Sequence, residues 1–227
     1  MISFLAAVIH GVVGFGFNFL CAPLLLLVYP KLVPAPLIIM GTAMVCLVAW
    51  TNRKDVAFDA LGWLVGACAL GSLAAGVALS MIKESAYSAL FGSLLLLAVV
   101  LSLLGWRPKV TAMSASIAGG ISGFMGTITA VGGPPAALLL HGLSAQQLRG
   151  TMSAYFLMSA PFIFLALYGA GRLGWQEVKL APVLLPGMLL GFACSKYLTK
   201  YLSTLIVRRL VLSICAGSGV VLLVRSW

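Results

Sequence analysis

Apolar runs of about 18 or more residues recur along this chain of 227 residues, and they limit the folds that it can adopt. Only 8% of the residues are charged, whereas a soluble domain carries about a quarter. Backbone N–H and C=O groups in lipid must pair within the protein, which leaves helices or a closed barrel. Runs such as 94–104 and 211–224 do not alternate in polarity as barrel strands do. We therefore expect an all-α polytopic membrane protein.

Two stretches rich in glycine interrupt these runs. The longer one, residues 119–135, holds six glycines and two prolines in seventeen residues, and a shorter and more apolar copy covers residues 11–23. Glycine and proline weaken or break a helix, and serine and threonine can bond the freed backbone groups. We expect a helix break in each stretch. Pro134 and Pro135 suit the first turn of a new half-helix that covers residues 136–141.

The two halves of the chain share one plan. Residues 11–14 align with residues 120–123, and the order of apolar segments repeats after them. A repeat of about 110 residues is too long for a solenoid unit and fits a duplicated transporter half. The sequence therefore predicts an N-terminal transmembrane repeat over residues 1–109 and a C-terminal one over residues 110–227.

Each predicted half contains one broken segment and three further apolar segments. We expect the apolar segments at 2–29, 37–51, 60–82, 86–104, 111–142, 150–170, 180–200 and about 205–224, with polar connections that include 144–149 and 172–179. Broken segments that cross the membrane completely give eight spans and parallel halves. Re-entrant hairpins give six full spans plus two hairpins, and inverted halves.

The distribution of the fourteen basic residues bears on this choice. Complete crossings place seven on each side, whereas hairpins place nine on one side and five on the other. The positive-inside rule prefers an imbalance, so it favours hairpins with the nine-charge side in the cytoplasm. Those nine are Arg53, Lys54, Arg107, Lys109, Arg149, Lys196, Lys200, Arg208 and Arg209.

The charge pattern also limits the sign of charge that a transported solute can carry. The net charge is +10, but the basic residues are spread between the apolar runs and form no dense patch for nucleic acid. We interpret them mainly as topological charge at the membrane surface. All four acids lie in or beside predicted loops, although an intramembrane carboxylate is the usual mark of a cation-coupled carrier. The pattern argues against cation transport and suits a negative solute. The acids are Asp55, Asp59, Glu84 and Glu177.

The sequence contains no constellation typical of an enzyme or a metal site. The five cysteines lie in apolar surroundings without a CxxC pair, so we expect neither a metal site nor a disulfide. Two histidines and four peripheral acids, without HExxH or GxSxG, supply no nucleophile, base or metal set. We expect no enzyme activity and no cofactor. His10 and His141 lie at the edges of the two glycine stretches, and we interpret them as interface residues satisfied by a neighbour, with a proton relay as the alternative.

The two breaks are the candidate ligand site. A break exposes backbone amides and a half-helix N-terminus that can bind an anion at mid-membrane, while close helix packing through small residues is the alternative. Asn18, Thr127 and Thr129 could bond a solute oxygen or cap the local backbone. Lys31 and Arg149 follow the broken segments and could attract an anion or only set topology. The candidate substrate-binding residues are Gly14, Gly16, Asn18, Gly123, Gly126, Thr127, Thr129, Gly132, Gly133 and Pro134.

The second stretch resembles the TauE/SafE family of membrane transporters, also called the sulfite exporter family. The matching residues are GFMGTIT at 123–129 and GGPPAALLL at 132–140, with GVVGFG at 11–16 in the first half. Phe17 departs from the glycine-rich pattern that the resemblance leads us to expect. The resemblance covers nearly the whole chain. It implies a multi-pass protein of the bacterial inner membrane that moves small sulfur anions such as sulfite or sulfonates, and some relatives are linked to other carboxylates.

These observations together predict a transporter of small anions that works by alternating access around a central site. Its expected partners are a small anionic solute and the lipid bilayer, with no nucleic acid, and a homodimer is compatible with the pattern. Two alternatives stay open, a passive anion channel and a non-transporting scaffold subunit. Linear, non-saturating flux would favour the channel, and the absence of flux in liposomes would favour the scaffold.

Overall fold

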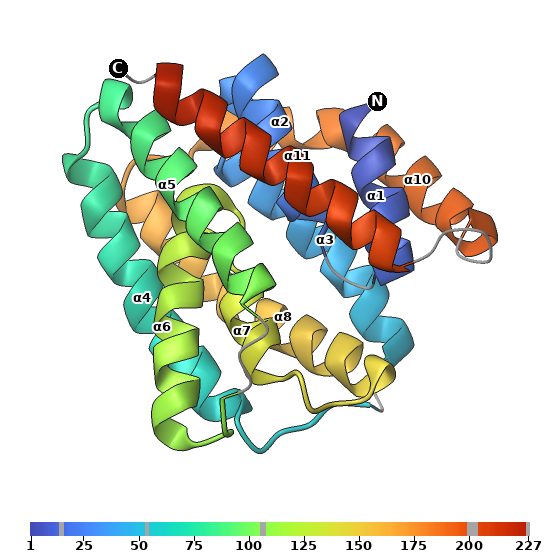
Figure 1. Cartoon of the computed structure of the whole chain (residues 1–227). Helices are drawn as coiled ribbons and strands as arrows, with labels where there is room; N and C mark the ends of the chain where they lie inside the picture. The colour runs from blue at the N-terminus through green and yellow to red at the C-terminus, as the bar shows by residue number, and fades with distance from the viewer. Residues whose placement is uncertain (14–15, 53–54, 105–107, 199–203, 226–227) are drawn as a thin grey trace.

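The structure is a computed structural model that describes residues 1–13, 16–52, 55–104, 108–198 and 204–225. The described residues form helices joined by short connections, as the sequence predicts (Figure 1). The α-helices are α1 (Ile2–Val13), α2 (Phe17–Val28), α3 (Ala35–Asn52), α4 (Leu61–Met81), α5 (Glu84–Leu103), α6 (Ala112–Thr129), α7 (Gly133–Leu139), α8 (Ala145–Gly169), α9 (Trp175–Leu180), α10 (Leu185–Leu198) and α11 (Thr204–Arg225). Two 3₁₀ turns complete the set, η1 (Pro30–Leu32) and η2 (Ala181–Leu184).

Most helix boundaries lie close to the predicted apolar segments, but the polar stretch 144–149 is helical rather than a loop. The Ser144 hydroxyl accepts a hydrogen bond from the Gln147 backbone N–H at 3.3 Å, and the Gln147 side chain accepts one from the Ser144 N–H at 3.2 Å. This reciprocal cap starts α8 at Ala145, so the polar residues form its first turn. The predicted connection 172–179 likewise contains the short helix α9.

Five helices in the described part of the chain are long and apolar enough to cross a membrane. They are Leu61–Met81, Ala86–Leu103, Ala145–Gly169, Trp175–Ser195 and Val207–Arg225. Three apolar helices are shorter, at Ile2–Gly11, Phe17–Val28 and Ala35–Trp50. The two arms of the first broken segment are therefore each too short to span a bilayer alone, because about 20 helical residues are needed. The total number of spans stays a prediction.

The first arm of the second broken segment, α6, packs along α4 with their backbones in close contact. A Cβ atom built at Gly119 would overlap the Leu64 carbonyl oxygen, and one at Gly123 would overlap the Cys68 carbonyl oxygen. The order of these contacts shows that the two helices run in the same direction. Small residues permit such close approach between membrane helices. These two glycines therefore serve helix packing.

The first arm of the first broken segment, α1, makes a corresponding contact with α10. A Cβ atom at Gly191 would overlap the carbonyl oxygen of Phe4, and one at Gly11 would overlap the side chain of Ser195. These two helices also run in the same direction, because the residue numbers of the contacts rise together. Each broken segment is thus packed against a helix from the other half of the sequence.

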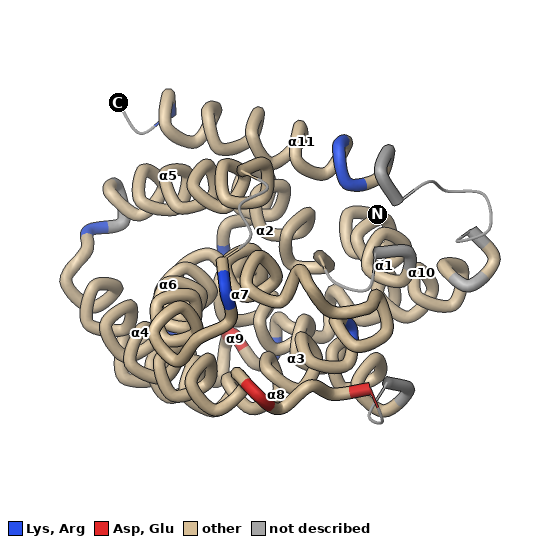
Figure 2. The backbone as a smooth tube through the Cα atoms, turned by 60° about the horizontal axis from the view of Figure 1, so that its bottom comes forward, with Lys and Arg blue, Asp and Glu red and all other residues tan. Residues whose placement is uncertain are grey.

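Two further helix pairs hold the broken segments between them. Helix α3 packs against α8, and α5 packs against α11 in the opposite direction. At one end of the second pair, Arg208 Nη2 donates a hydrogen bond to the Ser102 carbonyl oxygen at 2.6 Å. Further along the same pair, Gly92 lies against the backbone of Gly219. Lys, Arg, Asp and Glu residues lie mainly at helix ends and in connections (Figure 2).

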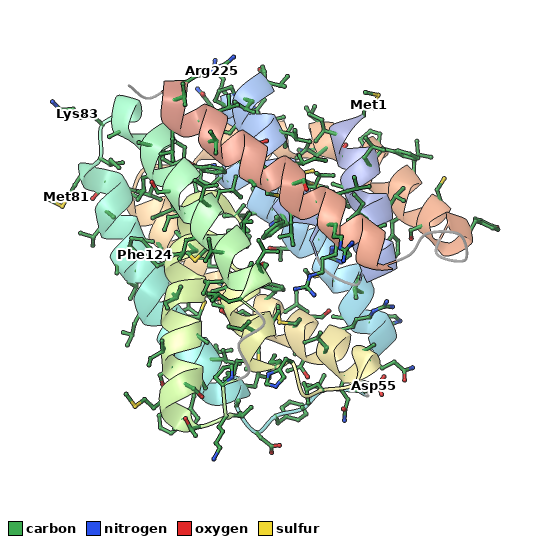
Figure 3. The ribbon with its side chains drawn as sticks, in the orientation of Figure 1. Met1, Asp55, Met81, Lys83, Phe124 and Arg225 are labelled. Atoms are coloured by element: carbon green, nitrogen blue, oxygen red, sulfur yellow. The ribbon has the colours of Figure 1, made fainter. Side chains whose placement is uncertain are left out.

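The broken segments enter the helix bundle from opposite ends. In Figure 1, α1 starts at the end that holds both termini and α2 returns toward it, whereas α6 starts and α7 ends at the other end. Lys83 and Arg225 mark the first end, and Asp55 marks the second (Figure 3). The connection between α6 and α7, residues 130–132, therefore lies buried inside the bundle.

Candidate functional site

Both helix breaks line one cavity of about 630 Å³. The first break contributes Gly16, Phe17 and Asn18, and the second contributes residues 130–134. Helices α3, α8 and α11 supply most of the remaining wall, much of it apolar. A cavity of this size, mostly apolar with a few polar groups, is typical of a small-molecule site. The apolar lining side chains include Ile9, Phe19, Ile38, Met152, Phe156 and Ile163.

At the first break, the chain turns through Gly16 and starts a new helix at Phe17. Gly16 has φ 115°, in the left-handed region that favours glycine. The backbone N–H of Phe17, the first residue of α2, donates a hydrogen bond to His10 Nδ1 at 3.2 Å. His10 is only 4% exposed and lines the cavity, and its buried Nε2 has no hydrogen-bond partner in the part of the chain that the structure describes. A histidine side chain thus links the two arms across the break.

Asn18 follows in the first turn of α2 and also lines the cavity. Its Oδ1 is buried and has no hydrogen-bond partner within the described ranges. The carboxamide packs onto α3 at Gly41, where a built Cβ atom would lie 2.5 Å from both Oδ1 and Nδ2. A buried polar atom without a partner costs free energy, so Asn18 and His10 are unusual members of the cavity wall.

At the second break, the polar groups near the turn are bonded within the protein. Ala130, with φ 63°, ends α6, and the Thr129 hydroxyl accepts a hydrogen bond from the Val131 N–H at 3.0 Å. The same hydroxyl donates to the Met125 carbonyl oxygen at 2.7 Å. The Ser122 hydroxyl donates to the Gly132 carbonyl oxygen. Helix α7 then begins at Gly133 with prolines in its first turn, so the predicted restart occurs, but the helix ends at Leu139, whereas the prediction placed it over residues 136–141.

The predicted site residues fall into two groups in the structure. Most of them line the cavity. Three do not, and Gly14 lies outside the described residues. The lining residues are Gly16, Asn18, Gly126, Gly132, Gly133 and Pro134, and the three others are Gly123, Thr127 and Thr129.

The three residues away from the cavity have evident structural contacts. Gly123 faces the backbone of α4 at Cys68. The Thr127 hydroxyl donates to the Gly123 carbonyl oxygen at 2.8 Å, one turn back along α6, as the Thr129 hydroxyl does to Met125. Both threonine side chains are fully buried. Their hydroxyls serve the backbone of α6, which is the capping alternative raised from the sequence.

Several polar residues of the cavity wall were not among the predicted site residues, among them His10, Tyr155 and Ser159. His10 is buried rather than at an interface, whereas His141 is exposed and its Nδ1 lies 3.0 Å from the Leu138 carbonyl oxygen. Ser159 and Tyr155 of α8 line the cavity, and the Ser159 hydroxyl is buried without a hydrogen-bond partner. An ionisable residue inside an apolar segment is a signal that could have identified His10. A serine in the middle of a span carries no such signal, because it commonly bonds its own helix.

The charged side chains on the cavity wall are arginines. Arg149 of α8 and Arg208 of α11 line the cavity, and no Asp or Glu of the described chain does. No group of three metal-ligating side chains lies together within the described ranges. The wall thus offers positive charge and hydrogen-bonding groups, an arrangement that can stabilise an anion.

Comparison with known protein families gives one result that covers nearly the whole chain. The family described as "Sulfite exporter TauE/SafE" matches residues 1–222. Comparisons with curated proteins and with solved structures find no match. The match extends over both glycine stretches and the helices that hold them. The chain therefore belongs to the TauE/SafE sulfite exporter family of membrane transporters.

Proposed function

We propose that this protein carries a small oxyanion across the bacterial inner membrane through the cavity between its two helix breaks. The observation that carries the proposal is the composition of the cavity wall. It joins both breaks, its charged side chains within the described chain are Arg149 and Arg208, and the buried His10 Nε2, which can donate to an oxyanion, has no hydrogen-bond partner among the described residues. Sulfite, sulfonates and small carboxylates share the chemistry that such a wall would recognise.

The charges on the wall favour an anion over a cation. A cation-coupled carrier needs a carboxylate or a cluster of carbonyl oxygens on its pathway. Here the arginines supply a positive field at the cavity. A half-helix N-terminus at α2 adds a partial positive charge in the same place, because the amides of its first turn point out of the helix.

Alternating access would use two duplicated halves, residues 1–109 and 110–227, in inverted orientation. Three observations support this part of the proposal. The α4–α6 contact corresponds to the α10–α1 contact, each break restarts a helix after a glycine, and the two broken segments enter from opposite ends (Figure 1). Inverted repeats allow a carrier to open the same site to either side by exchanging the conformations of its halves.

The test is solute flux in liposomes that contain the purified protein. We expect saturable uptake of labelled sulfite or a small sulfonate, with faster exchange when unlabelled anion is present on the opposite side. Uptake that rises linearly without saturation would replace the carrier by a passive channel. No flux of sulfite, sulfonate or carboxylate would contradict transport and favour a scaffold subunit.

A further inference from the structure

We propose that the headgroup of the transported anion binds at the first break alone, and that His10 is a binding residue there. This inference rests on the proposed function for the class of ligand, an oxyanion such as sulfite, a sulfonate or a carboxylate. The new point is which of the two helix breaks binds this oxyanion. The first-break site consists of His10, Asn18 and the backbone amides of the first turn of α2.

The second break has few hydrogen-bond donors left for a ligand. Helix α7 begins with Gly133 followed by two prolines, which have no N–H group. The Val131 N–H is bonded to the Thr129 hydroxyl, and the Ser122 hydroxyl is bonded to the Gly132 carbonyl oxygen. Helix α7 also has only seven residues, so its dipole is small. The second break is therefore held together by its own polar groups.

The first break has donors in excess. The first-turn amides of a helix have no acceptor within the helix itself. His10 Nδ1 takes the N–H of Phe17, and the N–H of Leu20 bonds the Gly16 carbonyl oxygen. The amides of Asn18 and Phe19 are the other two of that turn, and both residues line the cavity. Helix α2 has twelve residues, which gives its N-terminus a fuller dipole than that of α7.

The hydrogen bond from the Phe17 N–H determines which ring nitrogen of His10 can donate to a ligand. Since Nδ1 accepts a hydrogen bond from a backbone N–H, the proton of the neutral imidazole must reside on Nε2. His10 Nε2 is then a fixed donor. The residue is only 4% exposed, and Nε2 has no acceptor among the residues that the structure describes. An anion oxygen at the start of α2 would supply that acceptor. The same contact fixes the orientation of the ring toward the first turn.

Among the described residues, the other unpartnered side-chain atom outside the first break is Ser159 Oγ, and it does not require a ligand. Ser159 Oγ belongs to α8 and lies beside the Tyr155 hydroxyl. A hydroxyl group rotates freely, so Ser159 and Tyr155 can satisfy each other after a small adjustment of either side chain. His10 has no such freedom because its ring is bonded at Nδ1. The buried donor that needs a ligand as its hydrogen-bond partner therefore lies at the first break.

Two substitutions of His10 test separately the acceptor role of Nδ1 and the donor role of Nε2. In His10→Asn the side-chain oxygen can replace Nδ1 as the acceptor for Phe17, but the donor at Nε2 is lost. In His10→Gln the amide nitrogen can replace the donor at Nε2. Thr127→Val is the matched control at the second break, because it removes a hydroxyl that serves α6 and leaves the cavity wall intact. Binding of sulfite and of methanesulfonate to purified protein is measured by calorimetry.

We expect His10→Asn to weaken binding about 10- to 100-fold, the usual effect of losing one hydrogen bond to a charged group. His10→Gln should recover most of that loss, and Thr127→Val should bind within about threefold of the unchanged protein. Wild-type binding in His10→Asn, or a larger loss in Thr127→Val, would overturn the inference while leaving the proposed function intact. No binding by the unchanged protein would overturn both.

A second readout does not depend on affinity. ¹⁵N spectra of histidine-labelled protein contain signals from only two residues, and the His10→Asn variant assigns them. We expect the signals of His10 to be those of the Nε2–H tautomer, with the Nε2 signal shifting when sulfite is added. An Nδ1–H tautomer, or an Nε2 signal that sulfite leaves unchanged, would overturn the role of His10.

Discussion

Asn18 lies directly over Gly41, so that residue 41 has no room for a side chain. A Cβ atom at Gly41 would come within 2.5 Å of both Oδ1 and Nδ2 of Asn18, and real Cβ atoms essentially never approach within 3.0 Å. The glycine on α3 therefore creates the gap in which the carboxamide lies. Since the Oδ1 atom is buried without a partner, this position of Asn18 is maintained by shape rather than by a hydrogen bond.

Gly41→Ala should displace Asn18 and weaken anion binding about 3- to 10-fold, through loss of one polar contact at the first break. Gly66→Ala is the matched control, since residue 66 is also a helical glycine and has open space around its Cβ position. Binding of sulfite and the unfolding temperature of both variants check this prediction. Equal binding by both variants would mean that the position of Asn18 does not affect the ligand.

The sequence predicted the two helix breaks and the restart at Pro134 because proline and glycine act locally. A proline in the first turn needs no information from the rest of the fold. The cap that starts α8 is equally local, since Ser144 and Gln147 form a recognisable pair, yet these polar residues were interpreted as a loop. Local chemistry therefore accounts both for the correct boundaries and for the wrong one at the start of α8.

The division of the glycine stretch between packing and cavity could not be predicted from sequence. Gly123 faces α4 whereas Gly126, three residues later, lines the cavity. That division depends on which helix packs against each face of α6. The same holds for His10, which is buried only because α1 packs along α10 and meets the start of α2. The sequence predicted both stretches that line the cavity and six of the residues on its wall, but it did not separate these six from Gly123, Thr127 and Thr129.

The α4–α6 interface provides a test of the packing role of glycine. Gly123→Ala should destabilise the protein by about 1–3 kcal/mol, because its Cβ would overlap the Cys68 carbonyl oxygen. Gly120→Ala is the control on the same helix, since the nearest atom to its Cβ is the Ala67 carbonyl oxygen at 3.8 Å. Thermal unfolding in detergent measures the difference. Equal unfolding temperatures for the two variants would contradict backbone contact at Gly123.

Two neighbouring arginines near the start of α11 can distinguish an effect of charge at the cavity from an effect of the general surface charge on anion flux. Arg208 lines the cavity and Arg209 does not, although both are exposed and carry the same charge. Arg208→Gln should reduce anion flux at low ionic strength about threefold or more, with a smaller effect in about 1 M salt, where the screening length falls to about 3 Å. Arg209→Gln should leave flux nearly unchanged. Equal loss in both variants would indicate a general surface effect.

The orientation of the broken segments predicts which side of the membrane each connection reaches. Lys31→Cys and Ala145→Cys each place a thiol at an exposed position directly after a broken segment. Inverted hairpins place residues 31 and 145 on opposite sides, with residue 145 in the cytoplasm by the positive-inside rule. Complete crossings place both on the same side, because each broken segment then starts and ends on opposite faces of the bilayer.

The measurement uses an impermeant maleimide on sealed vesicles of known orientation, in a variant whose five native cysteines are replaced by alanine. Anion flux by that variant confirms that it is folded. We expect Lys31→Cys to react from the outer face and Ala145→Cys only from the cytoplasmic face. Reaction of both thiols from one face would rule out inverted hairpins. Each broken segment would then have to cross the membrane completely. That result would contradict the structure, in which the two arms of each segment return to the same end of the bundle.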